Sequence, residues 1–270
     1  MILREPCYDR PLDNPYLYGM PVLFPVNRIE GGRFEFEGRE YRFPINEPET
    51  GCLLHGILHA APFELAERGE DFLLCRFSAE AGEYMGFAHA FSVEMRYSLS
   101  EQGLSHEIAV KNLSGENMPV FIGFHTTFNS RFLPGAENVR VCVPTAREFE
   151  RDMKSYLPTG KNPEPDGVTL ELARGEFDPL SRPISRHYEG SGDMSITDID
   201  AGASVVYESS ENLSYRLIYN GGGAGFICLE PQSCMANCQN APEPRESFGF
   251  DYIASGCEKH YKTRIYLKKA

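Results

Sequence analysis

Hydrophobic residues in this chain recur most often at every second position, which is the period of a β-strand. Residues 34–36 and 41–43 alternate in this way on either side of the turn Glu37-Gly38, which predicts a hairpin. A second hairpin is predicted where the alternating runs 91–99 and 104–110 flank a polar turn. The first half of the chain is therefore expected to be β-structure.

Short strands are also predicted along the rest of the chain, where no long stretch shows the helical period of about 3.6 residues. The even-numbered residues of 118–124 should line one face of a strand. The other predicted strands are 139–143, 168–172, 204–207, 215–219, 226–229 and 261–267. Many short strands separated by Gly, Pro and Asn turns predict an all-β fold with two layers of antiparallel sheet.

The chain shows neither an internal repeat nor a stretch that clearly divides it. Residues 1–18 lack periodicity and are expected to form an extended lead-in, followed by a single domain over residues 19–270. The Pro-rich passage 157–165 is expected to be a surface loop.

Composition narrows the possible partners and location. The net charge of -13 opposes binding to nucleic acid or to an anionic membrane, so a small neutral molecule or a protein is the expected partner. The apolar runs are shorter than the roughly 18 residues of a membrane span, and the N-terminal sequence lacks a signal pattern, which favours the cytoplasm. The eight cysteines are then expected to be free thiols. Composition leaves the oligomeric state open.

His125 is the first candidate for chemistry. In the extended segment 121–129, alternation turns His125 away from the face of Ile122 and Phe124, so its side chain should reach either solvent or a cleft. Glu230 follows the apolar run 226–229 and precedes Pro231, where a strand should end. Each residue taken alone also fits a packed or solvated side chain.

Other motifs support little chemistry. His55 and His59 have the spacing of a helical zinc pair, but no HExxH pattern surrounds them, and the spacing of Cys228, Cys234 and Cys238 does not match a zinc site. The glycine-rich stretch 220–225 lacks the Gly-Lys-Ser/Thr of a phosphate loop and is expected to be a hairpin turn. No serine lies in a Gly-x-Ser-x-Gly elbow.

Several separated motifs together resemble the aldose 1-epimerases, or mutarotases. These motifs are Gly19-Met20-Pro21-Val22-Leu23-Phe24-Pro25, Asn27-Arg28-Ile29, Gly32-Arg33-Phe34, Leu54-His55-Gly56, Phe124-His125-Thr126-Thr127-Phe128-Asn129, Leu157-Pro158-Thr159-Gly160 and Cys228-Leu229-Glu230-Pro231-Gln232. Their order and spacing agree with the family from about Gly19 to the C-terminus. Each motif is weak alone, but the set is specific.

The resemblance implies an antiparallel β-supersandwich of the galactose-mutarotase type that interconverts the α and β anomers of a free aldose. It implies neither a metal nor an organic cofactor. The motif match makes His125 the expected general acid and Glu230 the expected general base. The expected contacts to the sugar are Arg28, His55, Asn27 and Asp178, of which Asp178 is the nearest match to a family aspartate although its flanking residues diverge.

Two departures from the family keep other functions open. Only 18 residues precede the first motif, where family members carry a few strands, so those strands are expected to be absent or replaced. Phe63 stands where the family often has Trp. The alternatives on the same fold are a non-catalytic sugar-binding protein and an epimerase for a hexose 6-phosphate, which would need basic residues such as Arg33, Arg131 or Arg147. A glycosidase is less supported, because no second carboxylate lies in a matching motif.

Overall fold

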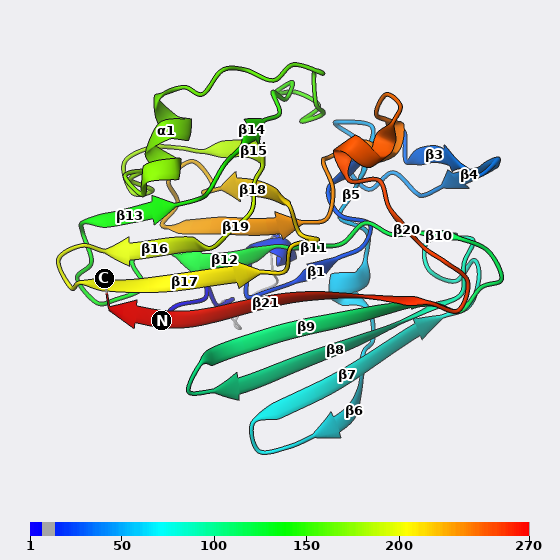
Figure 1. Cartoon of the computed structure of the whole chain (residues 1–270), viewed down its shortest axis with the longest axis horizontal. Coiled ribbons are helices and arrows are strands. Elements are labelled where there is room, and N and C mark those ends of the chain that lie inside the picture. The colour runs from blue at the N-terminus through cyan, green and yellow to red at the C-terminus, as the bar shows by residue number, and fades with distance from the viewer. Residues whose placement is uncertain (7–13, 270) are drawn as a thin grey trace.

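A computed structural model describes residues 1–6 and 14–269 as a sandwich of two large antiparallel sheets with three small two-stranded sheets (Figure 1). The predicted all-β antiparallel fold is confirmed. The predicted lead-in over residues 1–18 lies partly outside the described residues. None of the described helices is long and apolar enough to span a membrane.

The larger sheet has eight strands. Their spatial order is β13 (Val139–Cys142), β16 (Met194–Asp198), β17 (Ala203–Ser209), β21 (Glu258–Lys269), β9 (Gly103–Asn112), β8 (Phe91–Ser100), β7 (Phe72–Ala79) and β6 (Glu64–Arg68). The last four strands extend beyond the rest of the sandwich in Figure 1. The predicted hairpin of β8 and β9 is confirmed, with Ser100 paired to Gly103 at its turn.

The second large sheet has seven strands. Their order is β1 (Val22–Leu23), β11 (Gly123–Phe124), β19 (Phe226–Gln232), β18 (Tyr215–Tyr219), β15 (Ser185–Glu189) and β14 (Arg147–Glu148), with β12 (Thr126–Asn129) also paired to β19. All residues of β19 are buried. The strand β19 therefore lies in the interior of the molecule.

Three strand pairs and a few short helices complete the chain. The pairs are β2 (Arg28–Glu30) with β5 (Cys52–Leu54), β3 (Arg33–Phe36) with β4 (Arg39–Arg42), and β10 (Met118–Pro119) with β20 (Tyr252–Ile253). The 3-10 helices are η1 (Pro15–Leu17), η2 (Leu58–Ala60), η3 (Cys238–Asn240) and η4 (Arg245–Phe248). The β3–β4 hairpin is the one predicted around Glu37-Gly38.

The prediction of a strand over residues 168–172 is wrong, because this segment lies in the helix α1 (Gly167–Arg174). The side chain of Asp166 accepts a hydrogen bond from the Thr169 amide and caps the first turn, while Gly175, at a φ of 71°, ends the helix. Thr169 and Leu172 are buried, but Leu170 is 41% exposed. The buried face therefore follows a spacing of three residues rather than two.

The segment 118–124 forms the two short strands β10 and β11 instead of the predicted continuous strand. Its odd-numbered residue Phe121 is buried as completely as Val120 and Ile122. Alternation cannot identify an inner face here, because protein covers both faces.

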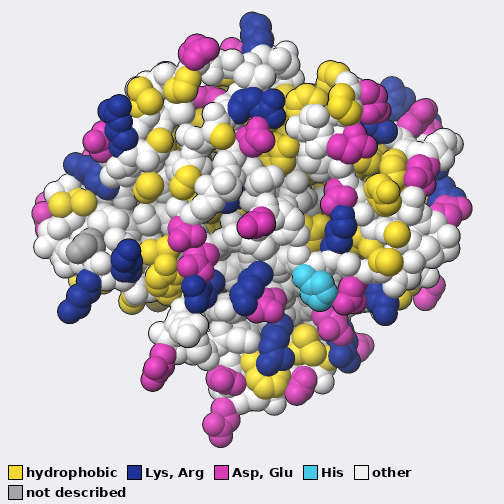
Figure 2. Space-filling model, in the orientation of Figure 1, with side chains coloured by type: hydrophobic (Ala, Val, Ile, Leu, Met, Phe, Trp, Pro, Cys, Tyr) yellow, Lys and Arg dark blue, Asp and Glu magenta, His cyan; other side chains and the backbone are white. Residues whose placement is uncertain are grey.

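Two hydrophobic clusters fill the space between and around the sheets. One contains Phe24, Phe91, Val110 and Phe124, and the other contains Phe128, Tyr207 and Ile227. On the face shown in Figure 2, acidic and basic side chains are interspersed.

The described part of the N-terminal segment runs beside β12. Leu3 forms a bridge with Phe128, and the side-chain amide of Asn129 donates to the carbonyl oxygens of Met1 and Leu3. The helix η1 then brings Tyr16 next to His125. The N-terminal residues are thus packed against the strand that follows His125.

Candidate active site

A cavity of about 320 Å³ opens beside the middle of the seven-stranded sheet, close to the end of β19. This volume is sufficient for a monosaccharide-sized ligand. Its polar and aromatic lining residues are Asn14, Tyr16, Asn27, Arg28, Glu47, His55, His125, Arg151, Tyr156, Ser185, Tyr219 and Glu230. Of the predicted site residues, the cavity brings together all except Asp178.

His125 and Glu230 meet because they are opposite each other on paired strands. Gly123 pairs with Gln232 and Thr126 pairs with Leu229, and this register places His125 across from Glu230. The His125 amide donates to Pro21 on the other side. The pair therefore occupies a position without hydrogen bonds between the two strands, where cross-strand side chains approach most closely.

The strand β19 does not end before Pro231, as the sequence predicted, but continues to Gln232. The interruption falls on the facing strand, because Pro231 has no amide hydrogen to donate to Phe124 and the ladder there divides into β11 and β12. Glu230 is consequently buried within the sheet and is only 1% exposed. A surface charge at this position is excluded.

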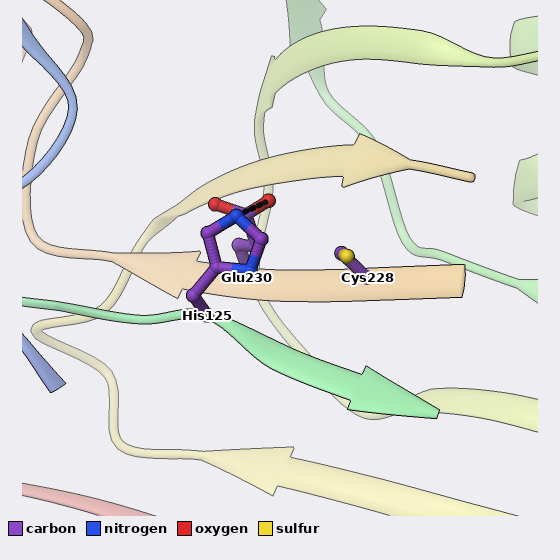
Figure 3. A group of neighbouring side chains, drawn as sticks. All are labelled: His125, Cys228 and Glu230. Atoms are coloured by element: carbon purple, nitrogen blue, oxygen red, sulfur yellow. Dashed lines mark ion pairs between the residues drawn. The ribbon is translucent and has the colours of Figure 1, made fainter. Parts of the chain in front are cut away.

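Figure 3 shows the His125 imidazole directed at the Glu230 carboxyl group, from the facing strand. The distance from Nε2 of His125 to Oε1 of Glu230 is 3.2 Å. Burial raises the pKa of Glu230 to about 8 and lowers the pKa of His125 to about 4. Near neutral pH the pair therefore holds one proton, and these pKa values place it on Glu230.

A hydrogen-bonded chain orients the Glu230 carboxyl group. The side-chain amide of Gln232 donates to Oε2 of Glu230 at 3.1 Å. The side-chain amide of Asn27 donates to the side-chain oxygen of Gln232, also at 3.1 Å. The Asn27 oxygen in turn accepts from the amide of Arg28. Asn27, predicted as a sugar contact, lies at the cavity wall with its side chain engaged in this chain. Gln232 belongs to the same sequence motif as Glu230, but the motif alone suggested no role for it.

His55 is held as a neutral hydrogen-bond donor at the cavity wall. Its Nδ1 accepts a hydrogen bond from the backbone amide of Asn27 at 3.3 Å, which leaves Nε2 to carry the hydrogen. Burial lowers the pKa of His55 well below its usual value. The next residue must be glycine, because a Cβ at Gly56 would collide with the carbonyl oxygen of Phe24. This close approach explains the Leu54-His55-Gly56 motif.

Tyr16 covers the histidines from the side of the N-terminal segment. Its ring centroid lies 4.8 Å from that of His55, 4.5 Å from that of His59 and 6.1 Å from that of His125. No sequence motif indicated this contact, because Tyr16 precedes the first motif. An aromatic residue thus forms part of the cavity although the chain contains no Trp.

Arg28 forms a two-pronged ion pair with Glu47, a residue that the sequence analysis did not select. Nε and Nη2 of Arg28 lie 2.6 and 2.7 Å from the two carboxylate oxygens. Burial alone would raise the pKa of Glu47, but hydrogen bonds from Arg28 and Thr50 outweigh burial and lower it. Glu47 is therefore ionised, and it fixes the guanidinium plane at the cavity wall.

Arg151 and Tyr156 also line the cavity, and both lie between β14 and the passage 157–165 that was predicted as a surface loop. The guanidinium group of Arg151 lies 5.9 Å from the ring centroid of Tyr156, and that of Arg28 lies 4.6 Å from it. Nη2 of Arg151 donates to the Ser185 hydroxyl at 2.9 Å. The sequence analysis missed both residues, since no motif marks them.

Asp178 lies away from the cavity. It follows Phe177, which is bridged to Val141 near β13, and its carboxylate accepts a hydrogen bond from the amide of Leu180. Asp178 therefore shapes a turn and does not line the cavity. Among the described residues, the carboxyl groups that line the cavity are those of Glu47 and Glu230.

Cys228 completes a group that could in principle offer ligands to a cation. The ligand atoms of His125, Cys228 and Glu230 lie within 4.8 Å of one another. However, burial raises the pKa of the Cys228 thiol well above its usual value, and its sulfur lies 3.3 Å from the Thr127 hydroxyl. The Cys228 sulfur thus packs against Thr127, beside the contact of His125 with Glu230.

The two large antiparallel sheets match the β-sandwich that the sequence motifs implied, and comparisons with known proteins identify the family. The sequence model of the family described as Aldose 1-epimerase matches residues 6–247. The chain belongs to the aldose 1-epimerase family.

Solved structures similar to this chain include mutarotase-like proteins. A galactose mutarotase-like protein from Clostridium acetobutylicum is 30% identical with a TM-score of 0.93, and the match covers 100% of this chain and 86% of that one. A GalM/aldose epimerase homologue from C. elegans has the same fold, with 12% identity, a TM-score of 0.77 and coverage of 100% and 88%. The uncharacterised Escherichia coli protein YihR is 30% identical over 119 residues, which are 43% of this chain and 38% of YihR.

Proposed function

We propose that the protein is an aldose 1-epimerase that interconverts the α and β anomers of a free aldose by opening and closing the ring. The observation that carries this proposal is the contact between His125 and Glu230 inside a cavity of monosaccharide size. Anomer exchange removes the proton from the C1 hydroxyl and donates a proton to the ring oxygen. Both oxygens are bonded to C1, so the acid and the base need to be neighbours, as these two residues are.

His125 and Glu230 can together remove one proton from the sugar and donate another to it. Glu230 accepts the hydroxyl proton as the base, and protonated His125 donates to the ring oxygen as the acid. Burial raises the pKa of Glu230 and so favours the proton on Glu230 before a sugar binds. The proposed roles therefore require that the proton first passes to His125 across their 3.2 Å contact, when sugar hydroxyls and the nearby arginines stabilise the ionised carboxylate.

Arg28 and His55 hold the sugar for this exchange. The Arg28 guanidinium is fixed by Glu47, and the Nε2 hydrogen of His55 is free to donate to a hydroxyl. After the ring opens, rotation about the C1–C2 bond presents the other face of the aldehyde, and the two proton transfers run in reverse. Rigid contacts to the remaining hydroxyls keep C1 next to the pair throughout.

The test is the rate of anomer exchange. Fresh α-aldose is dissolved with the protein, and the approach to equilibrium is followed by polarimetry or by NMR of the anomeric protons. We expect exchange well above the buffer rate and proportional to protein concentration. A rate equal to that of buffer alone, for glucose, galactose, glucose 6-phosphate and a hexuronate alike, would refute the enzyme.

A non-catalytic sugar-binding protein is the alternative that the same experiment addresses. Such a protein would give heat on titration with an aldose in calorimetry but leave the exchange rate unchanged. The contact between His125 and Glu230 favours the enzyme, because binding of hydroxyl groups alone does not require two buried titratable groups with oppositely shifted pKa values to touch each other.

A further inference from the structure

The two arginines of the cavity differ in their partners. The charge of Arg28 is matched by the carboxylate of Glu47. Arg151 is only 9% exposed, and no carboxylate among residues 1–6 and 14–269 forms an ion pair with it. Its hydrogen bond goes to the neutral hydroxyl of Ser185. A buried guanidinium without a counter-ion is costly, and such a group is usually matched when a ligand binds.

The local charge of the cavity is positive. Burial lowers the pKa of Arg151 to about 10, so this side chain is still protonated at neutral pH. Glu230, with its pKa raised by burial, is the only other carboxyl group that lines the described cavity besides Glu47, and it is neutral in the resting pair. Among the described residues, the cavity therefore holds two guanidinium groups and one carboxylate in ion-pair contact with Arg28, while Glu230, when ionised, attracts Arg151 without forming an ion pair.

The net charge of -13 does not cancel this local charge. Exposed carboxylates farther than about 8 to 10 Å away are largely screened at physiological salt, whereas charges inside a buried cavity are screened much less. Moreover, Arg28 and Arg151 approach the same ring of Tyr156, so a ligand beside that ring meets two guanidinium groups and one carboxylate.

We propose that Arg151 recognises a negatively charged substituent of the sugar, so that the preferred substrate is an anionic aldose rather than a neutral one. This inference rests on the proposed function and names its substrate class. The planar guanidinium matches the oxygens of a carboxylate, phosphate or sulfonate in two places at once. The Ser185 hydroxyl accepts a hydrogen bond from Nη2 of Arg151, and both residues line the cavity.

Binding can be measured without turnover. The probes are 1,5-anhydroglucitol and its 6-phosphate, which have no C1 hydroxyl and cannot change anomer, titrated by calorimetry into the whole protein. We expect the phosphate to bind at least ~10-fold more tightly than the neutral probe, and the preference to fall as salt is raised. Equal affinities for the two probes, together with equal exchange rates for the sugars below, would overturn the proposal.

Variants assign any preference to Arg151. Arg151→Met should reduce the affinity ratio of charged to neutral probe by ~10- to 10²-fold, while Arg151→Lys should keep part of it. The control is Arg147→Met, which removes a charge from the adjacent strand where Arg147 pairs with Glu189 outside the cavity. An unchanged ratio in folded Arg151→Met, or the same loss in Arg147→Met, would contradict the role of Arg151.

Exchange rates identify the source of the charge and separate this inference from the proposed function. Glucose, glucose 6-phosphate and glucuronate are compared by kcat/KM in the wild type. A faster reaction of either anion, through a lower KM that Arg151→Met reverses, supports the inference and distinguishes phosphate from carboxylate. Rapid exchange of glucose with no gain for either anion would leave the epimerase standing and refute the inference. No exchange of any sugar, with tight binding of the charged probe, would refute the epimerase alone.

Discussion

Two buried histidines, one from each large sheet, differ in their surroundings. His125 lies between β11 and β12 and faces the cavity, whereas His106 on β9 packs inside the protein. Phe124, the neighbour of His125, turns the other way and contacts the His106 ring at 5.1 Å between centroids. One strand thus separates a histidine that can meet a ligand from one that cannot.

Burial alone does not distinguish the two residues. It lowers the pKa of His125 to about 4 and that of His106 to about 3. The difference lies in their partners. His125 faces Glu230, while His106 stacks on Tyr97 at 4.1 Å, and neither of its nitrogens has a hydrogen-bond partner among the described residues. A buried histidine becomes a candidate for proton transfer only when a second titratable group and a cavity adjoin it.

Removing either member of the pair should have the largest effect. We expect Glu230→Gln and His125→Ala each to slow anomer exchange by at least ~10²-fold, which is the scale of a lost proton-transfer group. The matched control is His106→Phe, which should keep the exchange rate because it changes a stacked ring outside the cavity. The exchange rates of the folded variants are measured by polarimetry. A near wild-type rate for Glu230→Gln or His125→Ala would show that this residue does not carry the proton transfer.

The pH dependence of the exchange should report the shared proton. Below about pH 4 His125 is protonated as well as Glu230, so the pair has no base. Above about pH 8 Glu230 is ionised while His125 is neutral, so the pair has no acid. We therefore expect a plateau of kcat/KM between these values, with a fall of about tenfold per pH unit beyond each limb. A rate that is flat from pH 3 to pH 10 would contradict the one-proton pair.

Gln232 should affect the pair less strongly, by positioning it. Its hydrogen bond to Glu230 lowers the pKa of that carboxyl group, so Gln232→Leu should shift the alkaline limb to higher pH and reduce kcat by roughly tenfold. Asn27→Ala should act in the same direction through Gln232. An unshifted alkaline limb in Gln232→Leu would show that the hydrogen bond does not tune Glu230.

The smallest effect on turnover, but a measurable effect on stability, is expected at His106. Its pKa is about 3 in the folded protein and about 6.5 in an unfolded chain, so protons bind the unfolded state first. The stability due to neutral His106 is therefore complete above about pH 6.5 and is lost as pH falls toward 3. In His106→Phe the free energy of unfolding should fall less steeply there, by up to about 1.4 kcal/mol per pH unit. Denaturant titrations at pH 7 and pH 4.5 measure the difference.

Much of the fold, and the residues His125 and Glu230, could be predicted from the sequence because alternation and short motifs are local signals. Their mutual contact could not be predicted by local patterns, because it depends on the register of strands far apart in the chain. Glu47, Arg151 and Tyr16 escaped notice because they reach the cavity from loops or from the N-terminal segment.

Two of the prediction errors have equally specific causes. The strand predicted at 168–172 is the helix α1, because the cap at Asp166 and the stop at Gly175 outweighed an apparent alternation. The match to Asp178 placed a turn residue in the site, because a short Phe-Asp-Pro motif carries no information about where its loop lies.

The pairing of β12 with β19 has a practical consequence for refolding experiments. A slip of one residue would turn His125 to the opposite face from Glu230, and the acid and base would no longer meet. Molecules with compact but misaligned sheets would then be silent in the anomer-exchange assay. The recovered activity would measure the fraction of molecules with the correct strand register, and the recovered circular dichroism would measure the fraction with β-sheet. The difference between the two would give the fraction of molecules that formed sheets in the wrong register.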